Sequence, residues 1–118
     1  MGTLGELERT VMDAVWDDAE PVTAYDVRAQ LHDAGRDLAV TTLLTVLSRL
    51  EKKGFVASDR SARPHRYRAI ASREEHVAEL MHEVLGATND RVAVLERFVG
   101  GVSDEDAAAL RRLLQKSV

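Results

Sequence analysis

The segment from Ala39 to Val56, AVTTLLTVLSRLEKKGFV, constrains the fold more than any other part of this chain. Its apolar side chains recur at intervals of three and four residues, which predicts an amphipathic α-helix over residues 40–53. At about 100° per residue, four apolar side chains fall together on one side of this helix. They are Leu43, Val46, Leu47 and Leu50. The other side carries threonines and then cations, so the helix has one face for a core and one polar face.

The elements around this segment complete an informative order. Upstream, two helices are predicted, one starting at a capping box of Thr3 and Glu6 and one starting at Thr23. After Gly54 the repeat becomes that of strands, and FVASDR and HRYRAI, joined by SARP, predict a β-hairpin. Aromatic residues make up only 4% of the chain, which favours a helical core of Leu, Val and Ala. We therefore predict a mainly α protein with a small β-wing, beginning with a winged helix-turn-helix domain at residues 1–70.

Three further short helices are predicted within residues 71–118, starting near Ser72, Asp90 and Ser103. A segment of about 48 residues buries too little apolar surface to be stable alone, so we expect a second copy of the chain to complete its core. The alternative is that these helices fold back on the N-terminal domain. The expected dimerisation residues are Val77, Leu80, Met81, Val84, Leu95, Phe98, Leu110 and Leu114.

The charge of the chain is unevenly distributed. The net charge is −4, but residues 49–68 hold seven basic and two acidic side chains, a local charge of +5. Local charge attracts a polyanion more effectively than net charge does, and a helix with a small, hydroxyl-rich face fits a DNA major groove about 12 Å wide. The alternative is an ordinary solvated surface, because cations are common at helix C-termini. The predicted DNA-binding residues are Thr41, Thr42, Thr45, Arg49, Lys52, Lys53, Arg60, Arg63, His65 and Arg66.

Several other classes of function lack support in the sequence. There is no cysteine, which excludes disulfides, zinc–thiolate sites and cysteine nucleophiles. No catalytic or phosphate-binding motif is present, so we expect neither an enzyme nor a cofactor. His76, Glu79 and Glu83 share one side of a predicted helix and could hold a metal, but a solvated helix face is the better interpretation. No apolar run approaches about 18 residues, and no signal sequence is recognised, so we expect a cytoplasmic protein without membrane insertion.

Several motifs also carry a resemblance to a known family. The stretches LGELERTVMDAVW, TAYDVRAQL, VTTLLTVLSRLEKKGFV and HRYRAI resemble the penicillinase repressors of the BlaI, MecI and CopY type, and the resemblance continues through VLERFVGGVSDEDAAALRRLL. It implies a homodimeric transcriptional repressor with a dimerisation domain at residues 71–118. It also implies a palindromic operator with a TACA/TGTA core, controlling a β-lactamase, another antibiotic-resistance gene or a stress operon. Release would follow an upstream signal, for example from a membrane sensor-protease.

The sequence departs from these relatives in two places. The copper-responsive relatives sense metal through C-terminal cysteines, so that route is excluded here. The staphylococcal relatives are cleaved at an Asn-Phe bond in the fifth helix, and the matching position here is Arg97-Phe98. We therefore take Arg97 and Phe98 as the possible site of proteolysis. Two alternatives remain: a winged-helix module that binds proteins and not DNA, and a repressor on the same scaffold that responds to a small molecule.

Overall fold

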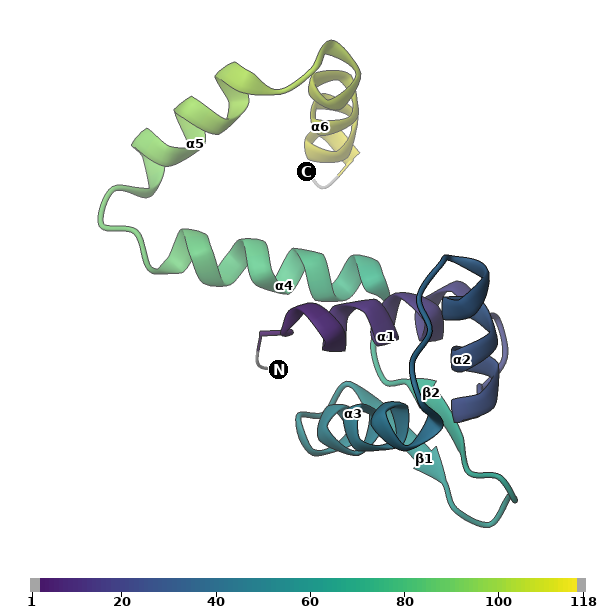
Figure 1. The fold of residues 1–118 in the computed structure, drawn as a ribbon. Coiled ribbons are helices and arrows are strands. Elements are labelled where there is room, and N and C mark those ends of the chain that lie inside the picture. Colours follow the sequence, from purple (N-terminus) through teal and green to yellow (C-terminus); the bar gives the residue numbers. More distant parts are fainter. Residues whose placement is uncertain (1–2, 117–118) are drawn as a thin grey trace. The chain divides into compact units, whose positions relative to one another are not determined.

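The order of elements in the computed structural model, which describes residues 3–116, is the one that the sequence predicts (Figure 1). Three helices precede a two-stranded antiparallel sheet, and three more helices follow it. The predicted fold class, mainly α with a small β-wing, is therefore confirmed. The elements are α1 (Glu6–Asp17), α2 (Ala24–Asp33), α3 (Val40–Lys52), β1 (Val56–Asp59), β2 (Arg66–Ala69), α4 (Arg73–Gly86), α5 (Arg91–Gly101) and α6 (Asp104–Lys116).

Short polar side chains start α2 and α6 as their sequences predict. At α2, the amide of Asp26 donates to Thr23 Oγ1 at 3.1 Å, and the amide of Thr23 donates to Asp26 Oδ2 at 2.9 Å. At α6, the amide of Asp106 donates to Ser103 Oγ at 3.0 Å. Each contact satisfies an amide that has no partner within its own helix, which is why these residue types mark helix starts.

The start of α1 differs from the prediction. The pair Thr3 and Glu6 does not form the capping box, because Gly5 occupies the cap and donates its amide to Glu8 Oε1 at 2.8 Å. Lys53 Nζ donates to the same oxygen at 2.8 Å, and this distant partner fixes Glu8 at the end of the helix. A local sequence pattern cannot contain such a contact, which is the physical reason for the error.

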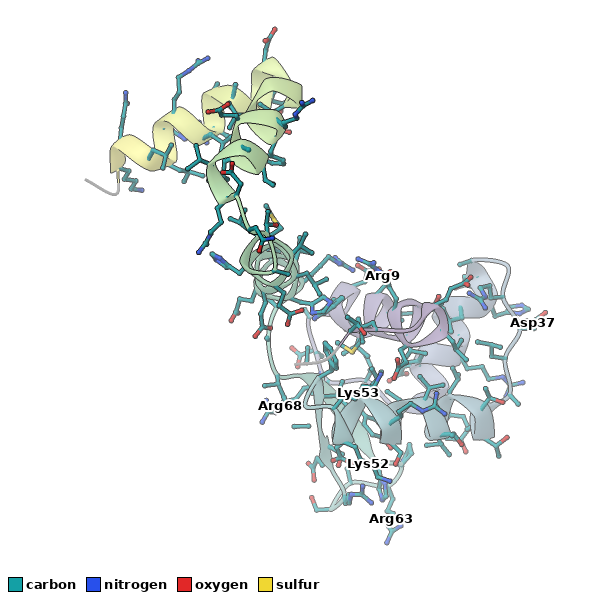
Figure 2. The ribbon with its side chains drawn as sticks, turned by 90° about the vertical axis from the view of Figure 1, so that its left-hand side faces the viewer. Arg9, Asp37, Lys52, Lys53, Arg63 and Arg68 are labelled. Carbon is teal, nitrogen blue, oxygen red and sulfur yellow. The ribbon has the colours of Figure 1, made fainter. Side chains whose placement is uncertain are left out.

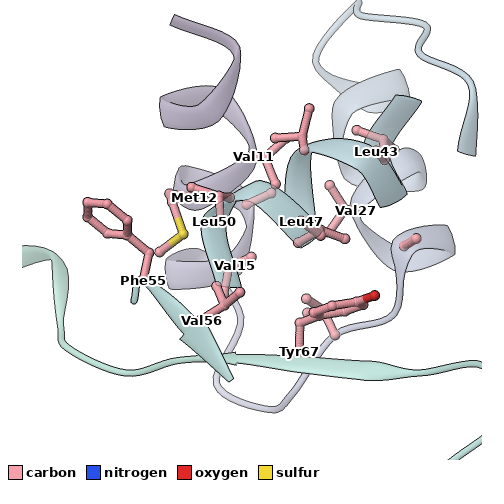
Figure 3. Close-up of a cluster of buried hydrophobic side chains, with 14 of the residues drawn as sticks. Val11, Met12, Val15, Val27, Leu43, Leu47, Leu50, Phe55, Val56 and Tyr67 are labelled. Carbon is pink, nitrogen blue, oxygen red and sulfur yellow. The ribbon is translucent and has the colours of Figure 1, made fainter. Parts of the chain in front are cut away.

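A single core joins α1, α2, α3 and the hairpin. The four apolar side chains predicted for the inner face of α3 are all buried, and Figure 3 shows Leu43, Leu47 and Leu50 among valines of α1 and α2. This core supports α3 along its whole length and leaves its opposite face outside. The buried hydrophobic residues are Val11, Met12, Ala14, Val15, Val22, Ala24, Val27, Leu31, Leu43, Val46, Leu47, Leu50, Phe55, Val56 and Tyr67.

The hairpin is attached to the helices by backbone hydrogen bonds as well as by packing. β1 and β2 pair with Val56 opposite Ala69 and Asp59 opposite Arg66. Val22, between α1 and α2, exchanges two backbone hydrogen bonds with Tyr67, at 2.8 Å and 2.7 Å. The base of the hairpin is therefore part of the helical core, while its connecting loop extends beyond it (Figure 1).

His76, at the start of α4, is buried and does not lie on a solvated helix face. It is only 2% exposed, and its ring contacts those of Trp16 and Phe55, with centroids 5.5 Å and 5.2 Å away. The interpretation of this histidine as part of a solvated face is therefore wrong. Glu79 and Glu83, which share its side of the helix, are exposed as expected. His76 itself is covered by the aromatic side chains of Trp16 and Phe55, which are distant in sequence.

The chain divides into two compact units, residues 1–78 and 79–118. The first unit holds α1 to α3, the hairpin and the first six residues of α4, and the second holds the rest of α4 with α5 and α6. The boundary lies within α4, a few residues beyond the predicted end of the DNA-binding domain. Within the described residues, no helix has the length and apolar character that crossing a membrane requires.

Candidate nucleic-acid interface

The outward face of α3 brings together five of the predicted DNA-binding residues. Thr41, Thr42, Thr45, Arg49 and Lys52 are all exposed, and they lie opposite the buried leucines of the same helix. Thr45 Oγ1 donates to the carbonyl of Thr41 at 3.0 Å, which keeps that hydroxyl close to the helix. The first half of this face carries the threonines with the exposed Leu44 beside them, and the face becomes cationic toward its end.

Arg49 and Lys52 form no ion pair with any residue that the structure describes. Together with Ser48 they line a shallow groove on the surface of α3. An arginine can donate two parallel hydrogen bonds to guanine or to a phosphate, and a lysine binds a phosphate as a point charge. Both charges are thus available to an external anion.

Lys53 differs from its neighbour Lys52. Its Nζ lies 2.8 Å from Glu8 Oε1 and also donates to the carbonyl of Thr3 at 3.2 Å. Glu8 is only 5% exposed, and the hydrogen bond from Lys53 holds the pKa of its carboxyl below the usual value. The structure therefore places Lys53 in an ion pair inside the domain and does not join it to the cationic face of α3.

The hairpin presents three arginines that have no ion pair within the described residues: Arg63, Arg66 and Arg68. Arg63 lies at the far end of the hairpin (Figure 2). His65, also predicted to bind DNA, is half-buried in the same loop. These side chains give the hairpin a positive outer surface.

Arg68 lies on β2 beside Arg66 and belongs to the same basic segment, residues 49–68. Along β2, Arg66 and Arg68 are exposed on either side of the buried Tyr67. Because successive side chains of a strand point to opposite faces, this alternation places Arg66 and Arg68 on the same outer face of the hairpin.

Arg60, predicted to bind DNA, is paired inside the domain. Its Nη2 lies 2.8 Å from Glu51 Oε1 on α3. Two of the seven basic side chains in residues 49–68, Lys53 and Arg60, are therefore neutralised by carboxylates of the same domain. The local positive charge is concentrated on the remaining five.

The predicted dimerisation residues lie on α4, α5 and α6. Two of them, Leu80 and Leu110, are half-buried, and the other six are exposed. Phe98, in the middle of α5, is 50% exposed, and the adjacent Arg97 of the possible proteolytic site is exposed as well. Large apolar side chains so exposed are unusual in a monomeric protein surface and indicate a surface that binds something.

Three helices followed by a two-stranded hairpin, with an exposed cationic face on the third helix, define a winged-helix domain of the kind that binds DNA. A MarR family protein from Bacillus stearothermophilus has a similar structure, with a TM-score of 0.52 and 19% identity over 98% of this chain and 73% of that one. RosR from H. salinarum is similar too, with a TM-score of 0.52 and 20% identity over 90% of this chain and 96% of that one. These likenesses show the fold alone.

Sequence comparisons give the family. The family described as penicillinase repressor matches residues 4–116. Two proteins named transcriptional regulator BlaI, from two strains of Mycobacterium tuberculosis, are each 47% identical over 114 residues, covering 94% of this chain and 82% of theirs. The chain belongs to the penicillinase repressor family. It is a transcriptional repressor with a winged-helix fold, and its relatives are regulators and not enzymes.

Proposed function

We propose that this protein is a homodimeric repressor that binds a palindromic operator through α3 and the hairpin of each subunit. The observation that carries the proposal is the threonine-rich outer face of α3, which ends in two unpaired cations, Arg49 and Lys52. A face of this shape and charge fits the major groove, where base edges can be read. The unpaired arginines of the hairpin then bind neighbouring phosphates.

The residues of this surface have different roles in the proposal. Thr41, Thr42 and Thr45 enter the groove, where a hydroxyl can bond to a base edge or a phosphate and a methyl can contact thymine. Arg49 reads a base or binds a phosphate, and Lys52 binds the backbone where the helix leaves the groove. On the hairpin, phosphate contacts come from Arg63, His65, Arg66 and Arg68. Lys53 and Arg60 are not part of the interface, because carboxylates of the same domain bind them.

The exposed apolar side chains of the second unit support a dimer. Every described side chain of α5 is exposed, including Leu95 and Phe98, and none of α6 is buried. A short helical segment with so little buried surface needs a partner to be stable. The partner that we propose is a second copy, covering the set formed by Val77, Leu80, Met81, Val84, Leu95, Phe98, Leu110 and Leu114. Residues 71–118 would then form the dimerisation domain.

Membership of the penicillinase repressor family supports the proposed targets. We propose that the protein acts in the cytoplasm on a promoter of a β-lactamase, another antibiotic-resistance gene or a stress operon. Release requires weakening of the dimer, since a single DNA-binding domain loses half of the phosphate contacts. Proteolysis at Arg97-Phe98, downstream of a membrane sensor-protease, would achieve this, because it would cut α5 within the proposed dimer contact.

The proposal is tested by measuring mass and DNA affinity on the same sample. Sedimentation equilibrium at micromolar concentration should give twice the chain mass of 13.0 kDa. Fluorescence anisotropy with a duplex that carries two inverted TACA/TGTA half-sites should show a Kd that rises steeply with salt. A monomer that binds this duplex tightly would contradict the dimer. The absence of binding to the duplex would favour the alternative, a winged-helix module that binds proteins and not DNA.

A further inference from the structure

The side chain of Glu51, on α3, connects that helix to the hairpin. Its Oε1 accepts a hydrogen bond from Arg60 Nη2 at 2.8 Å, and its Oε2 accepts one from the hydroxyl of Ser58 on β1. Arg60 Nε in turn donates to Ser58 Oγ at 3.3 Å, which closes a ring of three side chains. We call Glu51, Ser58 and Arg60 the strap. It joins the helix of the candidate DNA interface to the strand that leads into the loop of the hairpin.

Glu51 is charged at neutral pH. The hydrogen bond from Ser58, and after it the one from Arg60, lowers the pKa of its carboxyl below the usual value. Hydrogen bonds to an ionised acceptor are shorter and stronger than those between neutral groups. The side chain of Glu51 is 29% exposed and that of Arg60 is 65% exposed, so the surrounding protein shields only the Glu51 end of the strap from solvent.

Besides the two hydrogen bonds that Asp59 Oδ1 accepts from the amide and the hydroxyl of Ser61, few side-chain contacts restrain this part of the hairpin. Its base is held by the backbone hydrogen bonds between Val22 and Tyr67 and by the burial of Phe55 and Val56. Beyond Ser58 the chain is mostly exposed, and the two strands share only four residue pairs. A short two-stranded hairpin is marginally stable by itself. The strap is therefore placed where a side-chain restraint has the largest effect on the position of the loop.

We propose that Glu51 is a positioning residue for DNA recognition: through Ser58 and Arg60 it fixes the hairpin relative to the base-reading face of α3. By charge alone, a carboxylate on this helix opposes binding to a polyanion. By fixing the hairpin, it ensures that Arg63 and Arg66 reach phosphates only when α3 is seated in its proper register. Such preorganisation favours one site over others more than it raises affinity for all DNA. This inference rests on the proposed DNA-binding function.

The first measurement is the mobility of the hairpin without DNA. The sequence has no cysteine, so Ala62→Cys in the loop gives a single site for a nitroxide label in the full chain. In the Glu51→Ala and Ser58→Ala variants, the mobile fraction of the electron paramagnetic resonance spectrum should rise by about twofold or more, as expected for a released loop. The control Asp33→Ala removes an exposed carboxylate from α2 and should leave the spectrum unchanged. Ser58→Thr keeps the hydroxyl and should preserve the restrained spectrum.

The second measurement compares an operator duplex, obtained by footprinting, with a random duplex of equal length. Ser58→Ala breaks the strap, so it should weaken operator binding by roughly three- to tenfold. It does not alter the charge of the protein, so its affinity for random DNA should stay within about twofold of the parent chain. Glu51→Ala should strengthen random binding, because a repelling carboxylate is lost, and should lower the ratio of the two affinities. Ser58→Thr should keep the ratio of the parent chain.

The two measurements separate this inference from the proposed function. The role of Glu51 would be overturned if the nitroxide label stayed restrained in both Glu51→Ala and Ser58→Ala, or if the ratio of operator to random affinity were unchanged in both. Either result would leave the repressor proposal intact. If the parent chain does not distinguish operator from random DNA, the proposed function fails, and the role in selectivity fails with it. In that case the label spectra still decide whether the strap holds the hairpin.

Discussion

Lys52 and Lys53 are adjacent in the sequence, but replacing each by methionine should affect a different property of the protein. Lys53→Met should destabilise the fold and leave the salt dependence of DNA binding unchanged. Lys52→Met should weaken DNA binding and leave stability unchanged. The reason is that Lys53 Nζ lies 2.8 Å from the buried carboxylate of Glu8, whereas Lys52 has no ion pair within the described residues.

The size of the effect follows from the surroundings of Glu8. Breaking a fully buried ion pair costs about 3–5 kcal/mol, because a charge is left without compensation. The side chain of Lys53 is 35% exposed, and Glu8 keeps the hydrogen bond from Gly5, so water and this amide offset part of the loss. We therefore expect a loss of about 1.5–3 kcal/mol in the free energy of unfolding. The other carboxylate oxygen of Glu8, Oε2, is buried and has no hydrogen-bond partner within the described residues.

Two assays on each variant decide the question. Thermal unfolding followed by circular dichroism should show Tm lowered by roughly 6–20 °C for Lys53→Met. Anisotropy titrations with a fixed duplex over a range of salt give the slope of log affinity against log salt. That slope should flatten by about 1.8 for Lys52→Met, because each of the two subunits of the bound dimer loses one phosphate contact. If Lys53→Met flattens the slope as much as Lys52→Met does and leaves Tm unchanged, the reasoning is refuted.

Three further predictions follow from the same structure. The pKa of Glu8 is lowered on folding, so its stabilising contribution is complete above the unfolded value of 4.5 and is lost as the pH falls through the folded pKa. Urea unfolding below pH 4.5 should show this loss of stability. The loss should be smaller in Lys53→Met. His76→Ala should lower the free energy of unfolding by about 2–4 kcal/mol because a buried ring is lost, whereas His76→Phe, which keeps a ring between Trp16 and Phe55, should cost less than half as much in the same denaturant titration. Phe98→Glu places a charge in the proposed dimer contact, and sedimentation should then show monomers at concentrations where the parent chain is dimeric.

The sequence predicts the elements well where the signals are local. The inner face of α3, the capping box of Thr23 and the change to strands after Gly54 each depend on residues within a few positions of one another. Hydrophobic periodicity and capping act over such distances, and the structure agrees with both. The threonines, Arg49 and Lys52 share one exposed face for the same reason, because helical periodicity fixes which side chains point together.

Residue spacing does not reveal the environment of a side chain where a distant residue decides it. Helical periodicity turns Lys53 by about 100° from Lys52, but only the position of Glu8, 45 residues away, places Lys53 in an ion pair. His76 has the spacing of a solvated face, but Trp16 and Phe55 cover it after folding. Arg60 looks available for phosphate until folding brings the carboxylate of α3 beside it. Such contacts depend on tertiary structure, which residue spacing does not encode.

Hydroxyl-radical footprinting of the full chain on the upstream regions of its native genome tests the central proposal most directly. A dimer with two identical DNA-binding units should protect two half-sites related by a dyad, with centres about 34–36 Å apart or a multiple of that distance. Protection should saturate at two chains per site. Arg49→Ala should weaken binding to the operator more than it weakens binding to random DNA. A single asymmetric footprint that saturates at one chain per site, or equal loss on both DNAs for Arg49→Ala, would contradict the account.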